Sequence, residues 1–507
     1  MTEDGEESGG HRARDGESSA AIARNAFYLV LGQVATTALA IVLSAALARS
    51  LGAKDFGLYF LITTMSAFAY VFVEWGQQLF VIREVARRPD RAGGLLGTAL
   101  AMRVAGAALV SVPAGLLAWA LGYDARTCWL SVLFIAASLP FFLGQGYGMV
   151  FRARDQMGRD ATVSVANKVL ALAITLPALA LGTGVPGVVA AQGLAGLAAL
   201  AVAVWLYRRL QGPPLRVSSE TVRELVVGGA PIVAMTAAIA AQPYLDAVIL
   251  SKLAPATAVG WFGAAKNILG TLVAPAIILG AAAYPRLSRA AADPLALRRE
   301  VRAALRPLLW FGALAGVGTY LFADAVVALI YGASGFGPAG TILQVFAPGL
   351  FLLFVDVLLG NIILASGRAK GFAIAKVASV VVSTGLNFYL IPLFQERTGN
   401  GGIGVVVAFA ASELVVFAGA MVILPRGTLE PAAGLDVGRA LAAAAATTLL
   451  FRVLPPLSPF VGVPLCVAAF GAASVALGLV RRADLEVLQT LLRRRRSEPV
   501  PAAGEGP

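Results

Sequence analysis

The sequence has 507 residues, of which 58% are hydrophobic and only 13% are charged. Soluble domains average about 25% charged residues, so this composition excludes a soluble globular protein. The net charge of +12 does not indicate a nucleic-acid-binding protein, because the basic residues lie between long apolar segments and not together on one soluble stretch.

The amino-terminal segment, residues 1–23, is polar and contains both acidic and basic residues together with glycine and serine. It lacks the apolar stretch of a signal peptide, and we expect a disordered cytoplasmic tail. The single histidine, His11, lies in this tail, which excludes a histidine-based proton relay within the membrane. Cys128 and Cys466 have no CxxC or metal-ligand spacing, so we expect no metal site, structural disulfide or cofactor.

Fourteen apolar segments follow the tail, and each is long enough to cross a bilayer as a helix, which takes about 20 residues. The pattern predicts an all-α polytopic membrane protein. The predicted spans are 25–48, 57–80, 95–121, 128–150, 161–182, 186–206, 226–250, 258–284, 307–330, 340–365, 371–394, 403–424, 438–454 and 460–480.

The polar junction between the first two spans, residues 47–59, has a counterpart at residues 249–262 between the seventh and eighth spans. In both junctions a basic residue lies eight positions before a glycine, and an aromatic residue lies two positions after it. This repeat predicts two pseudo-symmetric six-helix lobes. The expected organisation is an amino-terminal lobe at 24–210, a cytoplasmic linker at 211–225, a carboxy-terminal lobe at 226–425, a last helix pair at 438–481 and a basic cytoplasmic tail at 482–507.

Within this last tail, residues 482–492 fit either an amphipathic helix on the anionic inner leaflet or a solvated chain. Residues 497–507 are rich in proline, glycine and alanine, and we expect them to be disordered.

The basic residues of the connecting segments indicate the topology. With the amino terminus inside, the cytoplasmic segments hold 30 lysines and arginines and the outer segments hold 6. This strong positive-inside bias predicts a multi-pass protein of the cytoplasmic membrane with both termini in the cytoplasm.

Several sequence segments resemble the bacterial polysaccharide and O-antigen flippases. NAFYLVLGQ, LARSLGAKDFGLY and WGQQLFVIREVAR, which begin at residues 25, 47 and 75, resemble the opening of those proteins. ILASGRAKG and LNFYLIPLF, which begin at residues 363 and 386, resemble their carboxy-terminal half. The family belongs to the multidrug/oligosaccharidyl-lipid/polysaccharide transporter superfamily, in which lipid II flippases and MATE multidrug exporters are relatives. The segment QERTGNGG at 395–402 departs from the short glycine turn that is common in the family.

This resemblance implies a flippase that moves an undecaprenyl-pyrophosphate-linked oligosaccharide from the inner to the outer leaflet by alternating access, for cell-surface polysaccharide biosynthesis. The implied partners are this lipid-linked substrate, membrane lipids, H+ or Na+ as a coupling ion, and other polysaccharide-assembly proteins. The last helix pair would line a groove for the lipid tail. The alternative is a cation-coupled multidrug exporter of MATE type. A glycan polymerase or ligase is disfavoured, because the outer segments are short and nearly uncharged.

Ionisable residues inside a membrane are costly and usually face a cavity or a partner. Three acid–base pairs lie at similar depths on their spans, and these pairs are either structural ion pairs or part of a hydrated cavity. The pairs are Glu74 with Arg103, Asp246 with Lys266, and Asp356 with Lys376, and Glu413 is a further acid within a span.

Lys168 has no obvious partner on a neighbouring span, whereas Lys376 shares a helix face with Ser383 and Asn387. Both lysines lie shortly after a Gly-Arg pair in corresponding spans of the two lobes, so they would face one another across a positive cavity. The spare lysines favour an anionic substrate over a cationic drug. The predicted substrate-binding residues are Lys168, Lys376, Arg103, Lys266, Glu74, Asp246, Asp356 and Asn387.

Cysteine labelling in a cysteine-free background tests the predicted topology. A cysteine at Ala254 should react with an impermeant reagent in sealed cells, whereas a cysteine at Gly212 or Ala503 should not, because the positive-inside bias places these two positions in the cytoplasm. Reaction at Gly212 in sealed cells would contradict the topology.

Overall fold

The computed structural model describes residues 4–332, 335–455 and 457–480. The elements of this part of the chain are α-helices and one short 3-10 helix, which confirms the predicted all-α class. The predicted segments 482–492 and 497–507 lie outside the described residues. Helix α1 begins at Asp4, within the segment that the sequence predicts to be a disordered tail.

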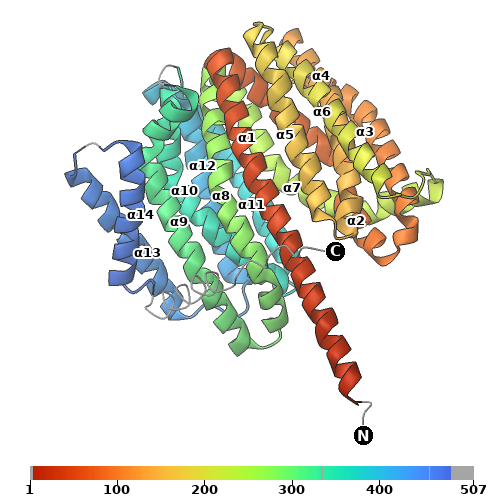
Figure 1. Cartoon of the computed structure of the whole chain (residues 1–507). Coiled ribbons are helices and arrows are strands. Elements are labelled where there is room, and N and C mark those ends of the chain that lie inside the picture. The colour runs from red at the N-terminus through yellow and green to blue at the C-terminus, as the bar shows by residue number, and fades with distance from the viewer. Residues whose placement is uncertain (1–3, 333–334, 456, 481–507) are drawn as a thin grey trace, which may run out of the picture. The chain divides into compact units, whose positions relative to one another are not determined.

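The helices follow one another with short connections along the whole described chain (Figure 1). They are α1 (Asp4–Glu74), α2 (Gln77–Arg87), η1 (Pro89–Arg91), α3 (Ala92–Ala120), α4 (Ala125–Ala153), α5 (Met157–Ala180), α6 (Gly184–Arg209), α7 (Ser219–Leu253), α8 (Ala256–Ala290), α9 (Pro294–Tyr331), α10 (Gly337–Ala365), α11 (Ala369–Thr398), α12 (Gly401–Ile423), α13 (Pro431–Val453) and α14 (Pro459–Ala476).

Helix α1 contains two predicted spans, because its backbone leaves the helical conformation at Gly52, where φ is 70° and ψ is 171°. Glycine adopts such a positive φ without the steric cost that a side chain would bring. In the described chain, 13 helical stretches are long and apolar enough to cross a membrane, and the first of them includes both parts of α1. Division at Gly52 therefore gives the fourteen predicted spans.

The second predicted span, 57–80, ends earlier than the sequence suggests. Trp75 and Gly76 have φ values of 49° and 67°, so α1 stops at Glu74 and α2 begins a new direction. The indole Nε1 of Trp75 donates to the carbonyl oxygen of Val226 on α7 at 3.0 Å. A Cβ at Gly76 would lie 2.7 Å from the carbonyl oxygen of Gly229, also on α7. This contact with α7 and the positive φ that Gly76 readily adopts together stabilise the break.

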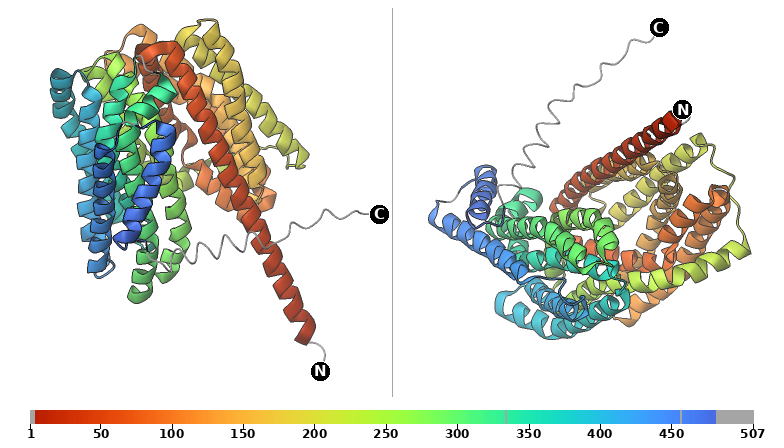
Figure 2. Two further views of the ribbon diagram at one scale, coloured as in Figure 1. Left: turned by 60° about the vertical axis from the view of Figure 1, so that its left-hand side comes forward. Right: turned by 90° about the horizontal axis from the view of Figure 1, so that it is seen from below.

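The chain forms two compact units. The first unit comprises residues 1–268, 327–339 and 383–405, and the second comprises residues 269–326, 340–382 and 406–507. These units do not coincide with the predicted six-helix lobes, because residues 327–339 and 383–405 of the later helices pack with the opening helices. The two lobes stay a prediction. In the first unit, α6 packs against α4 and α5, α3 packs against α4, and α1 packs against α5 and α7 (Figures 1 and 2).

The last helix pair packs on α9 within the second unit. Helices α13 and α14 contact each other, and both contact α9 through a small apolar core. Phe322 of α9 and Cys466 of α14 are buried in this core, and Phe451 of α13 packs against it with its ring 5.8 Å from that of Phe322.

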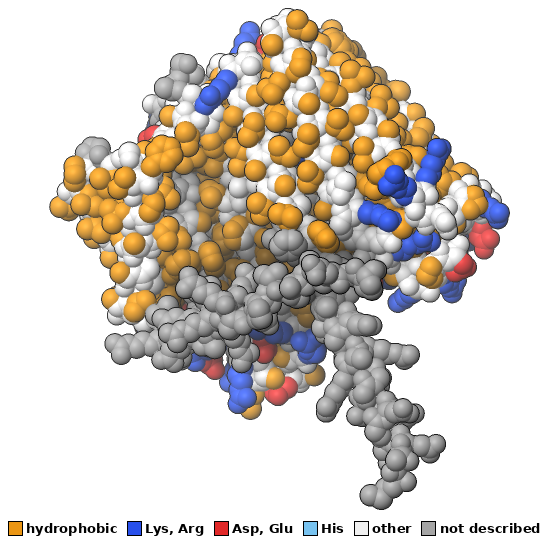
Figure 3. Space-filling view, in the orientation of Figure 1, with side chains coloured by type: hydrophobic (Ala, Val, Ile, Leu, Met, Phe, Trp, Pro, Cys, Tyr) orange, Lys and Arg blue, Asp and Glu red, His pale blue; other side chains and the backbone are white. Residues whose placement is uncertain are grey.

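The surface of the helices is largely apolar. Leu181, Val453 and Phe460 are 80% exposed or more, although they are hydrophobic. In Figure 3 hydrophobic side chains cover the middle of the visible face, and lysine and arginine side chains gather near the ends of the helices. An apolar band between charged ends is what a lipid bilayer requires of a spanning protein.

The two junctions that repeat in the sequence cross each other closely in the first unit. A Cβ at Gly57 would lie 2.2 Å from the carbonyl oxygen of Ala256, and one at Gly260 would lie 1.9 Å from that of Ala53. The glycines therefore allow backbone-to-backbone contact between α1 and α8, as small residues do at membrane helix crossings.

Gly260→Ala should lower the free energy of unfolding by about 1–3 kcal/mol, because the added methyl group overpacks this crossing. Thermal unfolding in detergent measures the effect. Gly270→Ala on the same helix is the control, since a Cβ there meets nothing within 4 Å. Equal stability of the two variants would show that the crossing is not tightly packed.

Candidate functional site

Arg103 of α3 lies at the centre of a polar network in the first unit. Its side chain is only 1% exposed. Its Nε donates to Oε1 of Gln77 at 3.1 Å, its Nη1 donates to the carbonyl oxygen of Phe142, and its Nη2 lies 3.4 Å from Oε1 of Glu74. The predicted pairing of Glu74 with Arg103 is therefore present.

This network continues from Glu74 to two further helices. With its amide oriented to satisfy both atoms, Gln78 of α2 donates to Oε1 of Glu74 at 3.1 Å and accepts from Nη1 of Arg152 at 2.7 Å. Nε of Arg152 on α4 in turn donates to Oδ2 of Asp160 on α5 at 2.8 Å. Two acids and two arginines thus join α1 to α5 in one charge-balanced chain.

Sequence reasoning found Glu74 and Arg103 in this network but missed Gln78, Arg152 and Asp160. Arg152 lies beyond the predicted span 128–150, whereas α4 continues past it to Ala153. The available signal was the arginine–acid spacing of Arg152 and Asp160, which face each other across the short turn between α4 and α5.

Asp246 of α7 is buried, with 1% of its surface exposed. Its Oδ1 accepts a hydrogen bond of 2.7 Å from Nδ2 of Asn387 on α11. The charge of Lys266 also acts on this carboxylate, in line with the predicted pairing. The sequence grouped Asn387 with Lys376 on one helix face, whereas the structure gives Asn387 a partner on α7.

Lys376 of α11 lies in the second unit with two carboxylates. Its Nζ lies 2.7 Å from Oδ2 of Asp356 on α10 and 3.9 Å from Oε1 of Glu413 on α12. The predicted pair of Asp356 and Lys376 is therefore present, and Glu413 adds a second acid that is 4% exposed. Lys376 is thus not a spare cation, because two carboxylates already compensate its charge.

Lys168 of α5 differs from the other lysines and arginines of the predicted site. It is partly buried, and within the part of the chain that the structure describes it makes no hydrogen bond or ion pair. A partly buried cation without a compensating group is the arrangement that an anionic ligand would complete.

In the described residues no group of three histidine, cysteine, aspartate or glutamate side chains could hold a metal ion. The two cysteines are free. The arrangement offers charged and polar groups inside a bundle of helices that are long and apolar enough to span a membrane.

The chain matches the family described as "Polysaccharide biosynthesis protein" over residues 22–291, which is more than half of its length. It belongs to this family. The match confirms the resemblance that the opening segments show.

Named relatives of this polysaccharide biosynthesis protein agree with the family match. The chain is 24% identical over 414 residues to an Escherichia coli (strain K12) protein named "Putative O-antigen transporter", and the match covers 78% of this chain and 94% of that one. The solved structure of "Lipid II flippase MurJ, inward closed conformation" superposes with a TM-score of 0.66 at 11% identity, covering 88% of this chain and 98% of that one.

An inward-facing multidrug resistance MATE family transporter of the MOP superfamily superposes with a TM-score of 0.64 at 16% identity, covering 76% of this chain and 94% of that one. At these identities the two superpositions show the fold alone. They confirm that this polysaccharide biosynthesis protein shares the fold of the lipid II flippases and MATE transporters.

The family match and the long apolar helices describe a multi-pass membrane protein of the polysaccharide biosynthesis family. The charged residues inside the spans therefore have two available roles, which are to bind a transported ligand or to hold helices together. The compensated groups Arg103 and Glu74 fit the second role, and the uncompensated Lys168 fits the first.

A double-mutant cycle tests the structural role of Arg103. Arg103→Gln should lower the free energy of unfolding by about 3–5 kcal/mol, because it leaves Glu74 charged and unpaired. Glu74→Gln combined with Arg103→Gln should cost much less than the sum of the single changes. Thermal unfolding of the purified variants is the measurement, with exposed Arg87→Gln as the control. Additive losses would contradict an ion pair.

Proposed function

We propose that this protein is a flippase that moves an undecaprenyl-pyrophosphate-linked oligosaccharide from the inner to the outer leaflet of the cytoplasmic membrane. The observation that carries the proposal is Lys168, an uncompensated cation inside a spanning helix of a polysaccharide biosynthesis protein. Both termini would lie in the cytoplasm. The proposed partners are the lipid-linked substrate, membrane lipids, H+ or Na+ as a coupling ion, and other polysaccharide-assembly proteins.

The charge of the substrate explains why such a cation is needed. A pyrophosphate and its sugars cannot cross hydrocarbon unaided, because a buried charge without compensation is very costly. Lys168 offers a positive charge in a partly buried site, where the attraction to an anion is stronger than at an exposed surface. Lysine also suits a moving substrate, since it acts as a point charge without the fixed fork geometry of arginine.

Lys376 is proposed as a second, weaker contributor. It would have to leave Asp356 or Glu413 in order to meet the substrate, because both carboxylates lie close to its Nζ. The sequence predicts a positive cavity with two equivalent lysines. We propose instead that the two lysines contribute unequally and that Lys168 is the principal anion-binding residue.

Contacts at one end of the first unit support alternating access. Arg49 donates to the carbonyl oxygens of Leu329 and Ile330 at 2.6 and 3.0 Å, at the carboxy-terminal end of α9. Ser44 of α1 lies 3.2 Å from the hydroxyl of Tyr331. These contacts join helices of the two predicted lobes, and we propose that they separate when the substrate leaves toward the outside.

A cation-coupled multidrug exporter is the second candidate. The fold of MATE transporters favours it, as do the two carboxylates around Lys376, which together exceed the positive charge there. The two candidates differ in the sign of the cargo. An anionic cargo depends on Lys168, and a cationic drug depends on Asp356 and Glu413.

Complementation of surface-polysaccharide export tests the flippase proposal. Lys168→Gln should reduce export at least about tenfold at normal membrane levels, which corresponds to about 1.4 kcal/mol of lost interaction, whereas Lys168→Arg should keep partial activity. Lys376→Gln should also reduce export, but with a loss of stability, since it leaves the two carboxylates unpaired.

Exposed Lys370→Gln is the control, and immunoblots report the membrane level of each variant. Full export by Lys168→Gln would contradict an anion site at this lysine. Drug efflux that depends on Asp356 and Glu413, without any effect on polysaccharide export, would favour the exporter instead.

A further inference from the structure

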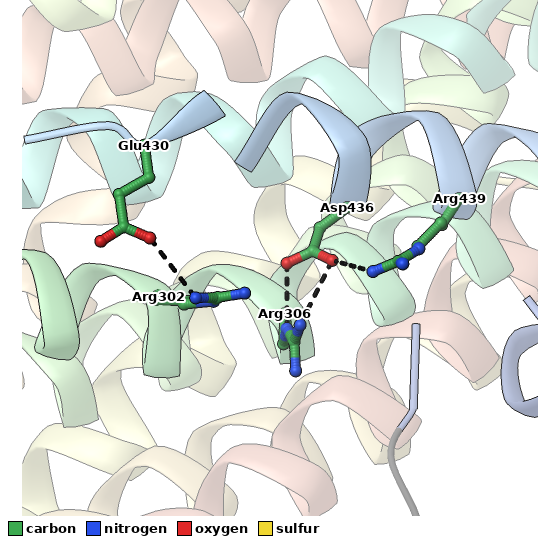
Figure 4. Close-up of polar contacts among 5 residues, drawn as sticks. All are labelled: Arg302, Arg306, Glu430, Asp436 and Arg439. Atoms are coloured by element: carbon green, nitrogen blue, oxygen red, sulfur yellow. Dashed lines mark hydrogen bonds and ion pairs between the residues drawn. The ribbon is translucent and has the colours of Figure 1, made fainter. Parts of the chain in front are cut away.

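Three arginines form a row on α9. Arg298, Arg302 and Arg306 recur every four residues, so they lie on one face of the helix. Within the second unit this face meets α13 and the loop that connects it to α12. Figure 4 shows Arg302 and Arg306 of the row beside Glu430, Asp436 and Arg439.

The charge of the row is compensated less and less toward the start of α9. Arg306 makes two contacts with fully buried Asp436, at 3.0 and 3.3 Å, and Asp436 also accepts from Arg439 at 3.0 Å. Arg302 makes one contact of 3.4 Å with Glu430, and both side chains are about 40% exposed. Arg298 has no carboxylate partner among the described residues.

The geometry around Arg298 indicates a missing acceptor. Its Nε is buried and has no hydrogen-bond partner in the described structure. Such orphaned donors are rare and usually mark a bound water or ion. Gly427, with φ of 79°, brings the loop backbone against the guanidinium, and a Cβ there would lie 2.2 Å from Nη2 of Arg298. The loop is thus shaped around this side chain.

A pocket opens between α9 and this loop, and both charged and apolar residues line it. Its positive charge exceeds its negative charge, since two arginines face the single carboxylate of Glu430. The polar lining residues include Arg298, Arg302 and Thr428, and the apolar ones include Val301, Leu305 and Leu429.

The length of α9 places this pocket at the level of lipid headgroups. The helix has 38 residues, which at 1.5 Å per residue gives about 57 Å, far more than the hydrocarbon core of about 30 Å. Because the predicted span within this helix is 307–330, its first turns extend beyond the hydrocarbon. From Arg306 to Arg298 the row rises about 12 Å, which is enough to cross the headgroup layer.

We infer that this pocket binds the phosphate of an anionic lipid, with Arg298 and Arg302 as its cations. The guanidinium of Arg298, which lines the pocket, donates to a phosphate oxygen, as the arginine fork does in phosphate sites. The start of the lipid chains packs on the apolar lining residues. The phosphate comes either from a glycerophospholipid or from a polyprenyl phosphate, and basic pockets of this kind on the cytoplasmic side of membrane proteins suit both.

Thermal unfolding of the purified full-length chain in maltoside micelles, which contain no phosphate, tests the site. Phosphatidylglycerol should raise the Tm of the wild type more than diacylglycerol with the same chains. Arg298→Gln should lose more than half of this extra shift. Arg299→Gln is the matched control, because it removes the same charge from the next, exposed residue, which does not line the pocket. Equal shifts in the two variants would overturn the site.

A second arm with undecaprenyl phosphate separates the two lipid sources. If only undecaprenyl phosphate gives a Tm shift that depends on Arg298, the pocket binds a polyprenyl carrier. If both lipids give such a Tm shift, the pocket binds phosphate headgroups in general. Native mass spectrometry of the wild type gives a readout that needs no variant. Preferential retention of phosphatidylglycerol or undecaprenyl phosphate over diacylglycerol supports the site, and equal retention of all three overturns it.

Discussion

The cost of a charge inside a membrane is the constraint on which the rest of this structure depends. In the first unit, Arg103 is almost wholly buried and is compensated by Glu74, Gln77 and a backbone carbonyl. The network that starts from this guanidinium reaches α5 through Gln78 and Arg152. Because removal of any charged member would leave another uncompensated, the five helices are held in one arrangement.

The same constraint organises the second unit, and two basic residues of the described chain depart from it. Lys376 lies between two carboxylates, and Asp436 of α13 lies between Arg439 of its own helix and Arg306 of α9, so that the contact with Arg306 joins the two helices. Lys168 and Arg298 stand out against this pattern, since the described chain gives neither of them a compensating carboxylate. A membrane protein that compensates nearly all of its buried charges leaves such positions for ligands, and both proposals of an anion site rest on this physical difference.

Small residues provide the second organising feature. The crossing of α1 and α8 at Gly57 and Gly260 brings two backbones into contact, and Gly76 does the same between the end of α1 and α7. In lipid, helices do not associate through the hydrophobic effect, so close packing of this kind contributes much of their attraction. A contact that depends on shape and not on strong bonds can also separate and re-form, as alternating access requires.

The sequence by itself determined the helical class, the number of spans and the residues that carry charge inside them, because hydrocarbon admits only long apolar helices and tolerates few charges. It also predicted the pairs Glu74–Arg103 and Asp356–Lys376, since equal depth on consecutive spans follows from residue counting. Only the tertiary structure decided the break at Trp75 and the hydrogen bond between Asn387 and Asp246. It also decided that two carboxylates compensate Lys376 and that none compensates Lys168. These depend on the rotation and packing of helices far apart in the chain, which apolar periodicity does not encode when nearly every face of a helix is apolar.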